Sequence, residues 1–207
     1  MAVDPIGIHD NDVLSSTRGA IFISKAGNIP AVSLLKQFDI EVETLGTDDD
    51  LWSNIGHTSN DTLPEFALDG GDATELSTWL KAQFRTRYDE TTGTVTFNSV
   101  QGDAASLELI YNGVVDTDGG VALSLEKSNN PYAVLILFKD TNINKKFAIL
   151  MPNVDLTFSN LPALSSGDDG FVEYGVSGTI KTSDALPKDK SGKTTSVKLY
   201  PQTALAA

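Results

Sequence analysis

The residues best suited to acid–base chemistry near neutral pH are two histidines, His9 and His57. A Ser-His-Asp triad would need His57 together with a serine on a Gly-x-Ser-x-Gly turn. That turn is missing from the sequence, and its nearest fragment, Gly175-Val176-Ser177-Gly178, lies inside an expected strand. We therefore interpret His57 as a structural histidine that makes hydrogen bonds at the end of a strand, and we expect no catalytic residue.

Three short motifs suggest ligand chemistry that their surroundings do not support. Ser191-Gly192-Lys193-Thr194 ends like a phosphate-binding loop, but Pro187 stands where the first glycine belongs. Asp116–Gly119 and Asp48–Asp50 gather carboxylates as calcium loops do, yet neither has the closing glutamate of a twelve-residue loop. The sequence has no cysteine, so it offers no thiol nucleophile and no thiolate metal site. We expect neither a metal nor a cofactor.

Two other function classes stay open at this point. The segment from Gln37 to Leu80 carries eleven carboxylates and no Lys or Arg, and two of these acids could form the carboxylate pair of a glycoside hydrolase. A monomeric β-sandwich that binds a carbohydrate or a cell-surface ligand is the other alternative. Such modules expose aromatic platforms, for which only Trp52 and Trp79 are candidate tryptophans.

The charge of the chain is strongly negative and unevenly distributed. Its 15 Lys and Arg against 28 Asp and Glu give a net charge of −13, which repels phosphate and argues against tight nucleic-acid binding. The segment Lys181–Lys198 is basic, so the two ends of the chain are electrostatically complementary. Two interpretations fit this pattern: a solvated acidic face with a solvated basic tail, or contact between copies. The longest apolar run, Tyr132–Phe138, is too short to span a membrane, and the N-terminus lacks a secretory signal. We expect a soluble protein made in the cytosol.

Strands are the main elements that must position these residues. From Thr74 to Asp89 the side chains alternate for sixteen residues, which predicts a single strand of about 50 Å. The turn signal Thr91-Thr92-Gly93 and a second alternating run follow, so the pair predicts a long β-hairpin. A strand longer than a lone domain must either bend across it or project from it.

The remaining pattern predicts a mainly β, antiparallel sandwich or barrel of about eight strands with one helix. The helix is expected at Asp103–Asn112, with Asp103 as its N-cap and Gly113 ending it. We divide the chain as one domain, 1–207, with an N-terminal arm (1–17), an acidic loop (39–51) and a C-terminal extension (184–207). Further strands are expected over 121–125, 132–138, 145–151 and 172–180, with the apolar 132–138 at the centre of a sheet.

One stretch of the sequence resembles a known family. Leu51–Ser59, Leu63–Phe66, Asp69–Asp72 and Ser77–Trp79 are similar, with their spacings, to the major tail tube proteins of long-tailed bacteriophages, especially those that infect actinobacteria. The residues that carry this structural motif are Trp52, Gly56, His57, Pro64, Phe66, Gly70, Gly71 and Trp79.

The resemblance implies a two-sheet antiparallel β-sandwich with one flanking helix, and a structural role without enzymatic activity. It implies hexameric rings that stack into a hollow tube, with the inner sheets joined into a shared barrel around a DNA channel. The implied partners are further copies, other tail proteins (tape measure, terminator and distal tail proteins) and DNA in transient, non-specific passage, without a membrane. The implied location is the tail of the virion, assembled in the host cytoplasm.

Under this interpretation two groups of charged and polar residues acquire roles. The channel-lining group is expected to be Glu75, Ser77, Gln83 and Asp89. The inter-subunit group comprises bases on the long strand, acids of the acidic loop and bases of the C-terminal extension: Lys81, Arg85, Arg87, Asp48, Asp49, Asp50, Lys188, Lys190 and Lys193.

Overall fold

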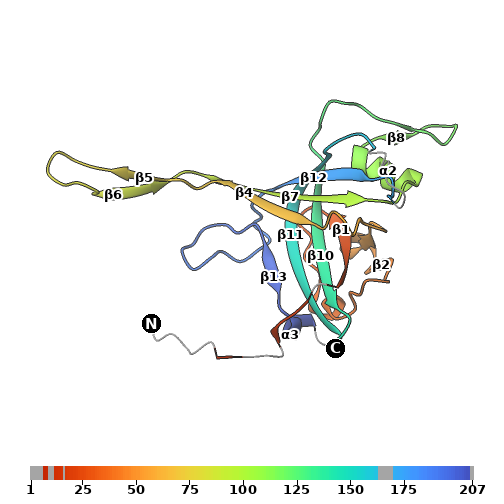
Figure 1. Cartoon of the computed structure of the whole chain (residues 1–207), viewed down its shortest axis with the longest axis horizontal. Coiled ribbons are helices and arrows are strands. Elements are labelled where there is room, and N and C mark those ends of the chain that lie inside the picture. Colours follow the sequence, from red (N-terminus) through yellow and green to blue (C-terminus); the bar gives the residue numbers. More distant parts are fainter. Residues whose placement is uncertain (1–6, 9–11, 16, 163–169, 206–207) are drawn as a thin grey trace.

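The apolar run Tyr132–Phe138 lies at the centre of an open, strongly bent antiparallel sheet (Figure 1). The structure is a computed structural model that describes residues 7–8, 12–15, 17–162 and 170–205. Within these residues nine strands join in the order β2-β3-β1-β10-β11-β12-β7-β4, with β13 also pairing β11. The sheet ends at β2 and β4, which do not pair with each other, so the described chain forms no closed barrel.

The elements have the following bounds. The strands of the large sheet are β1 (Arg18–Lys25), β2 (Thr44–Leu45), β3 (Trp52–Asn54), β4 (Glu65–Gly70), β7 (Thr91–Ser99), β10 (Pro131–Asp140), β11 (Lys145–Phe158), β12 (Tyr174–Ile180) and β13 (Lys198–Tyr200). Two small sheets pair β5 (Ala73–Leu76) with β6 (Arg85–Tyr88), and β8 (Val114–Val115) with β9 (Val121–Ala122). The helices are α1 (Val32–Leu35), α2 (Ala104–Tyr111) and α3 (Gln202–Leu205), with a 3-10 helix at Asp48–Asp50.

Strand β11 connects the two halves of the bent sheet. Residues 148–150 pair with β13 and residues 154–158 with β12, while β10 lies along the opposite edge. The β10–β11 register shifts between Tyr132 and Val134, and such a bulge bends a strand. The halves then pack face to face as in a β-sandwich. Gly178 permits the close approach of neighbouring strands, because a Cβ there would lie 2.5 Å from Cγ1 of Val154 on β11 and 3.1 Å from Cγ1 of Val95 on β7.

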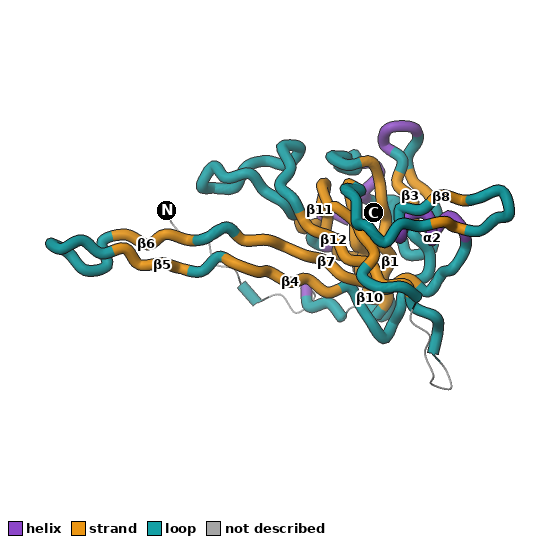
Figure 2. The backbone as a smooth tube through the Cα atoms, turned by 90° about the horizontal axis from the view of Figure 1, so that it is seen from above, coloured by secondary structure: helices purple, strands orange, loops and turns teal. Residues whose placement is uncertain are grey.

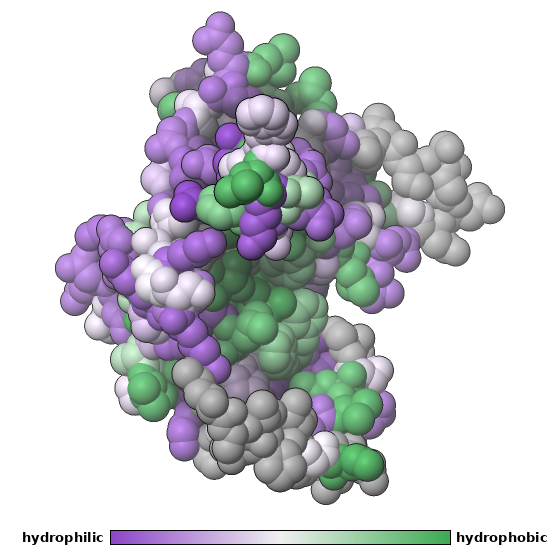
Figure 3. All heavy atoms as spheres, turned by 90° about the vertical axis from the view of Figure 1, so that its left-hand side faces the viewer, coloured by the Kyte–Doolittle hydropathy of each residue, from purple (hydrophilic) through white to green (hydrophobic). Residues whose placement is uncertain are grey.

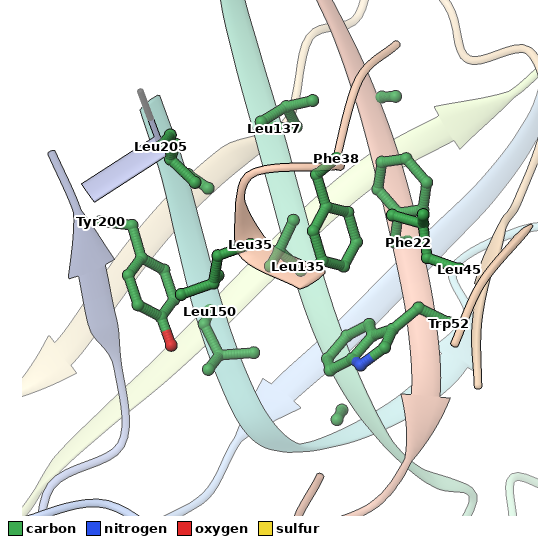
Figure 4. Close-up of a cluster of buried hydrophobic side chains, with 13 residues drawn as sticks. Phe22, Leu35, Phe38, Leu45, Trp52, Leu135, Leu137, Leu150, Tyr200 and Leu205 are labelled. Atoms are coloured by element: carbon green, nitrogen blue, oxygen red, sulfur yellow. The ribbon is translucent and has the colours of Figure 1, made fainter. Parts of the chain in front are cut away.

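Two hydrophobic cores lie on opposite faces of the β1–β10–β11 half. The first core is covered by α1, the segment before β2, β13 and α3, and its rings meet edge to face (Figure 4). The ring centroids of Phe22 and Phe38 are 4.9 Å apart, and those of Phe38 and Trp52 are 5.9 Å apart. The second core is enclosed by β7, β12 and α2, with Val95, Met151 and Val176 among its buried residues.

Helix α2 forms where the sequence predicts it. The carboxylate of Asp103 accepts hydrogen bonds from the backbone N–H groups of Ala105 and Ser106, both at 3.1 Å. The helix ends at Asn112 in the left-handed conformation (φ 49°), one residue before the predicted Gly113. Ile110 and Tyr111 are buried, so the helix covers the second core.

The structure corrects the prediction for Thr74–Asp89. These residues form a hairpin of β5 and β6 and not one strand, and Thr91–Gly93 lies within β7 and not in a turn. The alternation misleads because the hairpin reverses through Trp79 and Leu80 without a glycine, asparagine or aspartate to mark the turn.

Three other predictions differ in detail. There are more elements than eight strands and one helix; the expected strand 121–125 is limited to β9, whereas the strands expected at 132–138 and 145–151 extend to 131–140 (β10) and 145–158 (β11). The C-terminal extension contains β13 and α3, and its Leu186, Tyr200 and Leu205 are buried. In the part of the chain that the structure describes, no helix combines the length and the apolar character needed to cross a bilayer.

Candidate assembly surfaces

The most distinctive feature is a long two-stranded arm (residues 65–99) that leaves the body of the molecule (Figures 1 and 2). Its inner part pairs β4 with β7, and its outer part, the distal arm (73–88), pairs β5 with β6. The two ladders share one continuous register across Gly70 and Gly71. Every residue of β4, β5 and β6 is exposed, so the distal arm contributes nothing to either core.

The tip of the arm is a tight turn formed by two large apolar residues. The N–H of Thr78 donates to the carbonyl of Lys81 at 2.8 Å, and the N–H of Lys81 donates back at 3.2 Å, which leaves Trp79 and Leu80 as the turn. Their relative exposures are 107% and 98%. Phe84, Leu76 and Tyr88 add further exposed apolar surface to the distal arm. Two-residue turns favour Gly, Asn and Asp, so neither conformation nor solubility explains Trp79 and Leu80 at this place.

The root of the arm is fixed by a buried serine and a carboxylate. Ser59 Oγ donates to Oε1 of Glu173, and Asn98 Nδ2 donates to the other carboxylate oxygen at 2.7 Å. Ser59 Oγ also accepts from the N–H groups of Asp61 and Thr62, both at 3.2 Å. The hydrogen bonds from Ser59 and Asn98 lower the pKa of Glu173. This network ties the segment before β4 to β7 and to the start of β12.

The hairpin redistributes the charged residues that the single-strand prediction placed on one face. Glu75 is opposite Thr86, whereas Arg85 is opposite Leu76 and Arg87 opposite Thr74. Cross-strand partners share a face and neighbours along a strand alternate, so Glu75 lies on the other face from both arginines. Arg87 pairs with Asp89 at 3.4 Å within the same copy. The expectation that these acids and bases line one side of a strand is therefore wrong.

A second surface, the hydroxyl face, covers the side of β4, β7 and β12 that points away from the second core. Its cross-strand rows consist of small hydroxyl residues, carboxylates and one alanine: Glu65, Thr96, Ser177 and Thr157; Ala67, Thr94, Thr179 and Asp155; Asp69 and Thr92. These rows contain no Lys or Arg, although Lys181 pairs with Asp155 at 3.1 Å. Sequence reasoning missed this face, although the alternating threonines of Thr92–Thr96 signal it.

A third surface is formed by Phe138, Phe147, Ile149 and Leu199 and is called the apolar area. It lies on the same sheet face as the second core, past the part that β7, β12 and α2 cover. Leu199 pairs with Ile149, and Phe147 pairs with Phe138, on the face that holds buried Ile136. Leu199 is 58% exposed and the other three residues are half-buried. Phe138 and Phe147 line a groove of about 350 Å³. Figure 3 shows hydrophobic side chains gathered in a hollow below the arm.

The acidic and basic segments lie on opposite sides of the molecule. The acidic loop (39–51) contains β2, while the basic segment before β13 projects on the side of the arm (Figure 1). Asp49 pairs with Lys25 at 3.1 Å, and both side chains are largely exposed. The basic segment is an ordered loop, because Asp189 accepts from the N–H groups of Ser191 and Lys193, both at 2.8 Å. Charges of opposite sign on opposite sides suit head-to-tail contact between copies.

The structure separates the motif residues into different environments. Trp52 is fully buried in the first core, so it is not a platform for a sugar, whereas Trp79 lies at the tip of the arm. Phe66 is partly exposed on β4, Pro64 precedes that strand, and Gly56, Gly70 and Gly71 have positive φ. These residues shape the arm and its connection to the body.

No catalytic arrangement forms around His57. The backbone N–H of His57 donates to Gln101 Oε1 at 3.2 Å, and the backbone carbonyl of His57 accepts from the N–H of Val100 at 3.0 Å. It borders a groove of about 690 Å³ in which Glu41 faces Arg18 at 3.8 Å. Among the described residues no three His, Asp or Glu side chains are close enough to hold a metal ion.

Comparison with known proteins gives consistent matches. A family model described as phage tail tube protein matches residues 6–189. The major tail protein Gp23 of Mycobacterium phage D29 is 32% identical over 134 residues, which cover 64% of this chain and 68% of that protein. The Gp23 of Mycobacterium phage L5 is 31% identical over the same shares. A chain from the 6-fold symmetrised cryo-EM structure of the anti-feeding prophage (AFP) baseplate covers 96% of this chain and 97% of its own length, with a TM-score of 0.41 and 8% identity.

The family model and the two mycobacteriophage relatives agree with the resemblance carried by the motif around Trp52. The match to the family model, over residues 6–189, by itself covers most of the chain. The chain therefore belongs to the phage tail tube protein family, and it is a structural component of the phage tail and not an enzyme.

Proposed function

We propose that six copies of this chain close into a ring, and that rings stack into a hollow tube through which DNA passes. The observation that carries the proposal is the arm. Its strands β4, β5 and β6 are exposed along their whole length and display aromatic and aliphatic side chains, although isolated two-stranded ribbons are at best marginally stable in water. Neighbouring copies would supply the missing contacts.

Ring closure also accounts for the free edge of β4. This strand pairs with β7 on one side only, and its other edge presents unpaired backbone groups beside the exposed Leu68. Exposed edges with apolar side chains tend to aggregate unless another strand covers them. Joining the β4 edge to the next copy would extend the sheet formed by β11, β12, β7 and β4 into a shared barrel without edges.

The hydroxyl face has the chemistry that a DNA conduit needs. Threonine and serine hydroxyls keep water at the wall, and the carboxylates of Glu65 and Asp69 give phosphate no counter-charge to hold. We place this face toward the channel. On the arm, Glu75 and Ser77 continue this face by register and would extend the wall toward the tip, whereas Asp89, on the same face as Arg87, lies on the opposite side of the hairpin.

Charged segments would then set the register between copies. Asp48 and Asp49 are exposed in the acidic loop, whereas Asp50 is half-buried, and Lys188, Lys190 and Lys193 are exposed in the basic segment. Lys81, Arg85 and Arg87 would pair with carboxylates of a neighbour. Exposed pairs contribute only about 0.2–1 kcal/mol each, so they act on alignment more than on strength. The tube would assemble in the host cytoplasm with tape measure, terminator and distal tail proteins.

Assembly of the purified chain tests the central proposal. Sedimentation and negative-stain microscopy over a wide concentration range should show rings or tubes. A strictly monomeric chain at the highest concentration would overturn the proposal.

Passage of DNA is tested on complete particles. Glu75→Lys with Ser77→Lys, or separately Thr94→Lys with Thr96→Lys, should slow DNA release by adding counter-charge to the wall. Lysines at Asp116 and Asp118, on the loop between β8 and β9, are the matched control. Normal release from particles that carry both wall pairs would refute this placement.

A further inference from the structure

Two apolar surfaces have no covering partner among the residues that the structure describes. The first is the tip of the arm, where Trp79 and Leu80 are almost completely exposed. The second is the apolar area, where Leu199 is 58% exposed beside half-buried Phe147 and Ile149. The arm projects away from the body, so its tip does not cover the apolar area of the same copy (Figure 1).

We propose that the tip of the arm binds the apolar area of a second copy, with Trp79 and Leu80 seated on Phe138, Phe147, Ile149 and Leu199. This inference rests on the proposed assembly and specifies which two surfaces meet. The occupant is a second copy because the same chain supplies both the projecting apolar turn and an apolar area of matching chemistry.

The area available on the arm fits a stable contact. An aromatic side chain buries about 150–250 Å², and the distal arm presents Trp79, Phe84 and Tyr88 in addition to Leu76 and Leu80. Together they supply several hundred Å², which is most of the roughly 800 Å² that each partner contributes to a standard interface. The edge of β4 and the loops would contribute the remainder.

Charge favours the same pairing. The distal arm contains Lys81, Arg85 and Arg87 against Glu75 alone, so it has a net charge of +2 in a chain of −13. The groove beside Phe138 and Phe147 is bordered by Asp12 and Asp140, with Lys145 3.9 Å from Asp12. A basic tip is therefore attracted to the acidic body of any other copy, and the apolar turn then selects the apolar area.

Disulfide trapping gives a direct test because the sequence has no cysteine. Leu80→Cys and Leu199→Cys are made in separate copies, mixed, assembled and mildly oxidised. A disulfide requires Cα atoms within roughly 4.4–6.8 Å, so a mixed dimer forms only where tip and apolar area meet. Leu125→Cys, 70% exposed on the segment after β9 at the opposite end of the molecule, is the matched control partner for Leu80→Cys.

Tryptophan fluorescence provides the second readout. Trp52 is fully buried, so iodide quenching in the free chain reports on Trp79. We expect assembly to remove this quenching and to shift the emission to shorter wavelength, together with the Leu80–Leu199 cross-link. Assembly with Trp79 still quenched, or with cross-linking to residue 125 in place of 199, overturns the inference and leaves the proposed function standing. A chain that never assembles overturns both.

Discussion

Removing the distal arm separates folding from assembly in a single variant. Deletion of residues 72–89 joins Gly71 to Glu90, which leaves Gly70 and Thr91 paired across a two-residue turn. Gly71 already has φ +77°, as the first position of a type II′ turn requires. The deleted segment holds three acids and three bases, so the net charge stays at −13.

The expected effect on stability follows from burial. None of the deleted side chains belongs to a core, so no transfer free energy is lost. Shortening the connection between Gly70 and Thr91 from twenty residues to two removes about three doublings of loop length, worth about 0.6 kcal/mol each. The free energy of unfolding should therefore change by between zero and about 2 kcal/mol, toward greater stability.

Urea denaturation followed through Trp52 measures this change, and sedimentation with microscopy measures assembly. The deletion variant should unfold cooperatively, yet form neither rings nor tubes. A loss of more than about 2 kcal/mol would show that the arm is part of the folding unit and would refute the argument from burial. Normal tubes without the distal arm would refute its role in assembly.

Three further predictions concern other parts of the chain. Asp103→Ala should lower the free energy of unfolding by about 1 kcal/mol at pH 7, while Asp103→Asn, which still caps the helix, should retain most of the wild-type stability. Hydrogen bonds, first of all the one from the side chain of Gln101, lower the pKa of Asp103 from 3.8 to about 2. The difference in unfolding free energy between wild type and the Ala variant should therefore disappear as the pH falls through that interval. Reversal of Lys188, Lys190 and Lys193 to Glu should leave monomer denaturation unchanged but slow tube growth in light scattering, and unaltered growth would count against the charged contact. Gly178→Ala should cost about 1–3 kcal/mol in thermal or urea unfolding, because its Cβ would lie 2.5 Å from a core valine; an unchanged midpoint would contradict the tight packing of β12 against its neighbours β11 and β7.

Short sequence patterns predicted the elements that depend on residues close together in the chain. The run 132–138 is apolar on both faces because β10 has a core on each side, and this doubly buried pattern identified it as central. Asp103 predicted the start of α2, since an N-cap acts within three residues of the chain. The family was also identified correctly from the motif around Trp52.

The errors arose where alternation alone does not distinguish one strand from two. Side chains alternate between two faces in both strands of a hairpin, and Trp79–Leu80 is not a typical turn sequence. The alternation over Thr74–Asp89 therefore predicts one strand where the structure has β5 and β6. Two exposed apolar residues occupy this turn in place of the Gly, Asn or Asp that two-residue turns favour. The apolar area was missed for a different reason: Leu199 meets Ile149 only through the long-range pairing of β13 with β11.

The continuity of β11 determines how a mechanical load would spread through the subunit. A pull along the arm reaches β7, passes through the β7–β12 ladder, and enters the same strand that borders both cores. When the force acts along the strands, the hydrogen bonds between two antiparallel strands carry the load together and do not break one after another. In a tube wall built from such subunits, the packing of the two hydrophobic cores against β11 would resist the deformation.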